Sequence, residues 1–180
     1  MKKMIFLMML PLLLWSCGGE SAPKSELVEE AQTLMAKYPN FKSNDEARNL
    51  MDADIQSYAE QFVGKPAPFE GMEFMFSKLI DNPQTGEKSA LFESRGAYAE
   101  IDNPNAKGKY ISEEVQIAVL GIVPDDVALT LDGNINVRYK LSGVVHAYDE
   151  NDTFFIGDKM TGVYFGTFIL DNLKVEKVEK

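Results

Sequence analysis

The chain has 180 residues and a formal net charge of −10, and it contains one cysteine and one histidine. This length suits one domain that buries a substantial core. With 28 acidic residues against 18 basic ones, the surface repels phosphate backbones and anionic headgroups. One cysteine and one histidine also exclude an internal disulfide and the usual zinc ligand sets.

The N-terminal segment has the pattern of an export signal. Two lysines precede an almost purely apolar run, Met4 to Trp15, which is shorter than the about 20 residues of a membrane-spanning helix. The only cysteine, Cys17, follows this run after one serine. The stretch Leu14-Trp15-Ser16-Cys17 resembles the lipobox of bacterial lipoproteins, in which the cysteine is acylated and becomes the new N-terminus.

That resemblance implies a signal peptide over residues 1–16 and an acylated Cys17 that holds the protein to the membrane. Residues 17–24 then form a flexible tether. Removing residues 1–16, which hold two lysines, leaves 164 residues and changes the formal charge from −10 to −12. Gly18 stands where aspartate retains some lipoproteins in the inner membrane. The expected location is therefore the cell envelope, with outer-membrane anchoring favoured and the domain facing the periplasm or the surface.

Two amphipathic helices are predicted next. The first spans residues 25–37, with Ser25 as its N-cap and apolar residues at helical spacing. The second begins with a capping box formed by Ser43 and Glu46. Gly64 suits the position after its end, and two prolines beyond prevent its continuation.

From residue 69 onward the apolar period changes to two, which is typical of strands. Asp132-Gly133 is predicted as a hairpin turn, and Asp171-Asn172 as the turn before the last strand. Residues 114–123 are apolar on both faces, which predicts a central strand. About seven strands are expected, drawn from residues 71–80, 88–94, 96–100, 114–123, 127–131, 135–148, 153–156, 162–170 and 173–178.

These elements predict an α+β fold, in which two N-terminal helices precede a mostly antiparallel sheet or small barrel. Short connections between strands favour antiparallel pairing. Residues 25–64 are expected to form the helical pair and residues 69–180 the β domain, packed together as one globular unit. The C-terminal strands, with Gly157-Asp158-Lys159 and Ile169-Leu170-Asp171-Asn172 beside them, resemble the OB-like barrels of secreted bacterial proteins.

Aromatic residues of the predicted strands form the candidate binding surface. Phe154 and Phe155 are adjacent, as are Tyr164 and Phe165, so in a regular strand one member of each pair faces away from the core. Where the helices leave that face open, these four residues contribute an aromatic patch that binds a partner or ligand. The alternative is that the helical pair covers the same face.

Motifs for catalysis or metal binding are weak. His146 occupies an outward strand position, and a general base needs a reacting group within reach. The acidic stretch 149–152 lacks the glycine and glutamate spacing of an EF-hand loop. The sequence contains neither a nucleophile elbow nor a phosphate-binding glycine loop. We therefore expect no metal and no cofactor.

The sequence favours a membrane-tethered, non-enzymatic binding or accessory lipoprotein of the bacterial cell envelope. Its expected partners are the membrane, through the lipid on Cys17, and another envelope protein or a small ligand; nucleic acid is not expected. One alternative is an envelope hydrolase that uses carboxylates in a barrel mouth. Another is an OB-like binder of oligonucleotides or oligosaccharides, although the negative charge opposes an oligonucleotide.

Overall fold

The computed structural model describes residues 25–81, 85–150 and 162–179. The predicted signal, the tether, the strand at 153–156 and the pair Phe154 and Phe155 lie outside the described residues. The predicted α+β class is confirmed, with six strands among the described residues where about seven were expected over the whole chain. The elements are α1 (Glu26–Lys37), α2 (Asp45–Glu60), β1 (Phe74–Asp81), β2 (Lys88–Ser94), β3 (Tyr98–Asp102), β4 (Tyr110–Val123), α3 (Asp125–Ala128), β5 (Tyr139–Asp149) and β6 (Gly162–Lys177).

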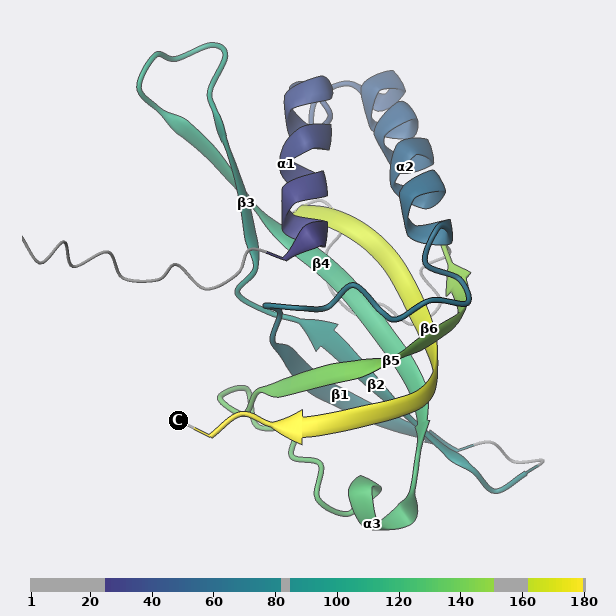
Figure 1. Ribbon diagram of the computed structural model, residues 1–180. Coiled ribbons are helices and arrows are strands. Elements are labelled where there is room, and N and C mark those ends of the chain that lie inside the picture. Colours follow the sequence, from purple (N-terminus) through teal and green to yellow (C-terminus); the bar gives the residue numbers. More distant parts are fainter. Residues whose placement is uncertain (1–24, 82–84, 151–161, 180) are drawn as a thin grey trace, which may run out of the picture.

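Five of the strands form a ring. The sheet has the order β2-β1-β5-β6-β4-β3, and an additional pairing between β2 and β4 closes it (Figure 1). All neighbouring strands are antiparallel except β4 and β6, which are parallel. This strand order, with α3 between β4 and β5, resembles the five-stranded Greek-key barrel of OB type. Antiparallel pairing is expected between strands that follow each other through a short connection. β4 and β6 do not follow each other, because β5 lies between them in the chain and pairs with the other edge of β6.

Helices and barrel share one core. Leu27 of α1 and Met51 of α2 are buried in the same apolar cluster as Val115, Ile117 and Val119 of β4. Figure 1 shows α1 and α2 over one end of the ring and α3 at the opposite end. β4 pairs with β2, β3 and β6, which confirms its predicted central place.

The predicted cap of the second helix is wrong by one residue. Asn44, not Ser43, is the N-cap, and its side chain accepts hydrogen bonds from the amides of Glu46 and Ala47. The Ser43 hydroxyl instead donates to the Asn40 carbonyl. Asparagine and serine are both good caps. Because the Ser43 hydroxyl is hydrogen-bonded to the preceding turn, Asn44 caps the helix instead.

The hairpin predicted around Asp132-Gly133 is wrong. Residues 125–128 form α3, and β5 begins at Tyr139 rather than at residue 135. Pro124 precedes α3 as its N-cap residue, and two aspartates occupy the first turn, where negative charge suits the helix dipole. These local signals outweigh the period-two pattern of the same stretch.

The turn predicted at Asp171-Asn172 is also wrong, because β6 continues through it to Lys177. Asn172 has a φ of 53°, a left-handed conformation that asparagine tolerates better than most residues. The register with β5 shifts between the pairs Ser142–Lys174 and Val144–Asp171. A bulge therefore bends β6 where the sequence predicts a reversal.

Candidate functional site

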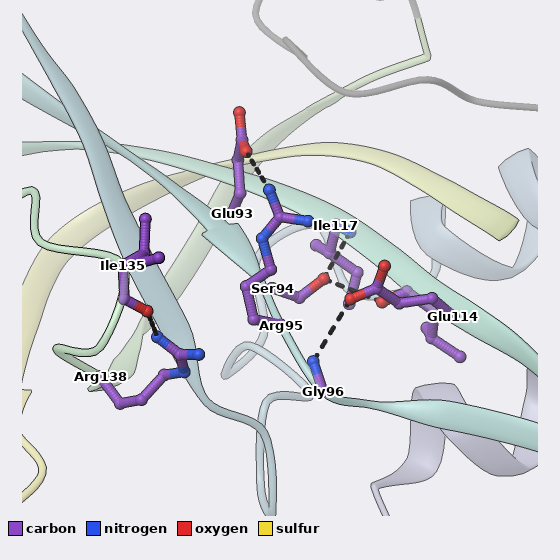
Figure 2. A network of polar contacts seen from close by, with 9 residues as sticks. Glu93, Ser94, Arg95, Gly96, Glu114, Ile117, Ile135 and Arg138 are labelled. Carbon is purple, nitrogen blue, oxygen red and sulfur yellow. Dashed lines mark hydrogen bonds and ion pairs between the residues drawn. The ribbon is translucent and has the colours of Figure 1, made fainter. Parts of the chain in front are cut away.

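A kink separates β2 from β3, and polar side chains hold it together. Both strands pair with β4, and the chain leaves the ladder between them at Gly96, whose φ is 74°. The Ser94 hydroxyl donates to the Val115 carbonyl and accepts from the Ile117 amide, each at 2.9 Å. The Gly96 amide donates to Glu114 Oε1 at 3.3 Å (Figure 2). Side chains thus replace the backbone bonds that the kink removes.

Side chains on the outer side of the ring beside this kink form a polar cluster that is largely buried. Glu93 of β2 pairs with Ala118 of β4, which pairs with Thr167 of β6. One step away on the same face, Gln116 pairs with Tyr164. Paired residues share a face of the sheet. We define the outer polar face as Glu93, Arg95, Gln116, Tyr164 and Thr167.

Glu93 is the most unusual member of the outer polar face. It is only 6% exposed, yet its Oε1 atom is buried without a hydrogen-bond partner. Its Oε2 atom lies 3.6 Å from a terminal nitrogen of Arg95, whose side chain is 39% exposed. An unsatisfied buried acceptor costs about 1–3 kcal/mol. A molecule that binds beside the exposed Arg95 side chain and donates a hydrogen bond to Glu93 Oε1 would remove that cost.

Two hydroxyl groups lie on the β6 side of the outer polar face. Tyr164 Oη and Thr167 Oγ1 are 3.4 Å apart. Burial raises the pKa of the Tyr164 hydroxyl; the carboxylates of Asp149 and Glu93 raise it further, and the Thr167 bond opposes them. The phenol therefore keeps its proton at neutral pH and can act as a donor or an acceptor.

The charges of this face balance, because Glu93 and Arg95 carry opposite signs. Carboxylate and guanidinium stand beside an amide and two hydroxyls, so acceptors and donors alternate over a short distance. Such an arrangement suits a neutral ligand with many hydroxyl groups. It offers no cluster of cations for a phosphate backbone.

The structure separates the predicted aromatic residues. Tyr164 is half-buried on the outer polar face, whereas Phe165 faces the core and is fully buried. The ring of Phe165 lies 6.3 Å from that of Tyr58 in α2, so the helical pair covers this member of the patch. Phe154 and Phe155 lie outside the described residues.

Sequence reasoning missed Glu93 and Arg95. The available signal was a glutamate directly after the apolar residues 90–92, with an arginine and a glycine two and three positions later. A charged residue in such a strand is either at an exposed face or paired. Only the register with β4 shows that the surrounding face is buried.

His146 is exposed on β5. His146 is 64% exposed at its side chain, and its Nδ1 lies 3.1 Å from Asp171 Oδ2. Within the described ranges, no three histidine, cysteine or acidic side chains gather as metal ligands. Among the helices that the structure describes, none is long and apolar enough to cross a membrane.

No family model matches the chain, and neither a curated protein nor a solved structure does so. The class of the protein therefore comes from its own strand order: a small OB-like barrel with a helical cap and one outer face of mixed polar groups. The chemistry of that face is the basis for a functional proposal.

Proposed function

We propose that this protein is a membrane-tethered, non-enzymatic binding module of the bacterial cell envelope. The lipobox-like segment ending at Cys17 supports the tether. The observation that carries the binding role is the buried, unpartnered Oε1 atom of Glu93 on the outer polar face. A binding role needs only this acceptor and its neighbours, without an activated nucleophile.

The chemistry of the face favours an oligosaccharide over an oligonucleotide. Sugar hydroxyls donate and accept hydrogen bonds, and so match a surface where Glu93, Arg95 and Tyr164 alternate acceptor and donor roles. Tyr98 and Tyr110 are 54% and 70% exposed on the adjoining β3–β4 hairpin, and aromatic rings present apolar faces to sugar rings. Twelve net negative charges on the mature chain oppose a nucleic acid.

Calorimetric titration with a neutral soluble glycan, the tetramer of N-acetylglucosamine, tests the proposal on the full chain in detergent. We expect saturable binding that Glu93→Gln weakens at least about tenfold, equivalent to about 1.4 kcal/mol. Glu113→Gln is the matched control. Glu113 is similarly buried, at 7% exposed, but has Lys42 as its ion-pair partner.

Two results would overturn the proposal. One is the absence of saturable binding by the parent chain at millimolar glycan. The other is an equal loss of affinity in the Glu93 and Glu113 variants, which would mean that any change in a buried carboxylate disturbs the barrel.

A further inference from the structure

A recess adjoins the outer polar face at Tyr164. It is a groove of about 380 Å³ between α2 and the ends of β5 and β6. Arg48, Asp52 and Gln56 of α2 line one side, and Tyr148 and Glu150 lie among the strand residues that line the other. Its volume falls within the about 300–1,000 Å³ typical of small-molecule sites.

Arg48 is the distinctive group of this groove. The chain has three arginines; Arg95 pairs with Glu93, and Arg138 pairs with Glu73. Arg48 forms no ion pair with any residue that the structure describes, and one terminal nitrogen is buried without a hydrogen-bond partner. Arginine is suited to binding carboxylate through two parallel hydrogen bonds. A shielded guanidinium in a protein with ten excess negative charges therefore favours a ligand that brings its own carboxylate.

Acidic residues in the same groove restrict which anions fit. Asp52, one helical turn after Arg48, and Glu150 both line it. Two carboxylates oppose a dianion such as phosphate, and they favour a ligand that also carries a positive charge. Arg48 and Asp52 are one helical turn apart, so their side chains can converge on a ligand that carries both charges close together.

The rest of the groove supplies a donor and an apolar floor. Tyr148 lies against Gly166, where an added Cβ would stand 2.6 Å from the phenolic oxygen. Burial is the main cause that raises the pKa of the Tyr148 hydroxyl. The phenol therefore keeps its proton and can donate a hydrogen bond. Met51, Ile55 and Val163 line the groove and are buried, so an apolar group can pack there.

We infer that this groove binds a small zwitterion, an α-amino acid with an apolar side chain. Arg48 receives the carboxylate, Asp52 and Glu150 attract the ammonium group, and the apolar side chain packs toward Met51 and Ile55. The groove adjoins the proposed glycan face, because Tyr164 belongs to both. The charged groups that bind the zwitterion lie outside that face, so variants of Arg48 and of Glu93 test the two sites separately.

Titration of the full chain in detergent with L-leucine, leucine amide and N-acetylleucine tests each part of the inference. We expect saturable binding of leucine, with at least about tenfold weaker binding of both derivatives, since each lacks one charge. Arg48→Met should abolish leucine binding, whereas Arg138→Met, which changes an arginine outside the groove, should not. The double variant Asp52→Asn, Glu150→Gln should reduce the difference in affinity between leucine and N-acetylleucine.

Arg48→Lys keeps the charge but loses the paired donors, so it should retain weakened binding and the parental melting temperature. The inference is overturned if the parent binds no leucine at millimolar concentration, or if Arg48→Met binds it as the parent does. Both Arg48 variants should bind the glycan normally, and Glu93→Gln should bind leucine normally. Either site can therefore fail while the other stands.

Discussion

Ser94 and Ile117 are joined across the kink by one hydroxyl, which accepts the Ile117 amide proton at 2.9 Å. The same hydroxyl donates to the Val115 carbonyl. Its position between two buried backbone groups explains why a small polar residue ends β2.

Ser94→Ala should lower the free energy of unfolding by about 1–3 kcal/mol, because it leaves a buried amide and carbonyl without this partner. Urea denaturation of the full chain measures the loss. Ser89→Ala, on the same strand, is the control, since its hydroxyl forms no hydrogen bond with the described residues. Equal midpoints for the two variants would contradict the bridging role.

Leu27→Ala and Ile117→Ala should each cost about 2–5 kcal/mol. Both side chains are 0% exposed, although Leu27 belongs to the first turn of α1, beside the predicted tether. Leu129→Ala, at an 84% exposed position, should change stability by less than about 0.5 kcal/mol. Circular dichroism in urea should show one transition, and a separate early loss of helix in Leu27→Ala would mean that α1 is not part of the barrel core.

Asp54 provides a pH-dependent contribution to stability. The Lys37 ammonium and the Tyr38 hydroxyl each lie 2.7 Å from Asp54 Oδ2, and both lower the pKa of this carboxyl. Because the pKa is lower in the folded state than in the unfolded state, the contribution is present at neutral pH and disappears as acid protonates Asp54. The same contact raises the pKa of Lys37 to about 12, so the lysine stays charged throughout.

Asp54→Asn should therefore lower the melting temperature at pH 7 by a few degrees at most, since the pair is partly exposed. The difference from the parent should shrink as the pH falls below the ordinary aspartate pKa, and it should vanish once the pH is below the lowered pKa of the folded state. Glu70→Gln, at an exposed carboxyl with no ion pair among the described residues, controls for general charge loss. A difference that persists in acid would assign the effect to packing instead of charge.

Cys17→Ser should release the protein from the membrane fraction or leave its signal uncut. An acyl chain contributes about 0.8 kcal/mol per buried methylene, and an acidic domain offers no basic patch to replace it. Fractionation and mass spectrometry of the mature N-terminus measure the outcome. A mutant that is processed and still sediments with membranes would refute the lipid anchor.

The helices and the apolar strands could be predicted because their signals are local. Leu27, Leu34 and Met35 recur at helical spacing, and Val115, Ile117 and Val119 alternate as strands require. A small barrel was one of the two predicted forms of the sheet. The pairings that close it, β2–β4 and β4–β6, could not be predicted, because they depend on contacts distant in sequence.

The candidate site was harder to predict than the fold. Tyr164 was expected at a binding surface, but Phe165 turned out to face the core. Whether Glu93 is exposed or buried depends on which strand lies beside it, and the sequence does not show which strand that is. Arg48 was equally inaccessible to pattern reasoning, since a lone arginine on a helix is normally exposed to water.

The parallel pairing of β4 and β6 also governs the order of assembly. In the sheet, β6 lies between β4 and β5 and pairs with both. The ring therefore cannot close until residues 162–177 are in place. Pairings between segments distant along the chain form slowly. A chain that crosses a membrane unfolded would thus hold β1, β2 and β4 with an open edge while its last strand is still in transit. During that interval the exposed edge of β4 is where an envelope chaperone would protect the protein and where a protease would cut it.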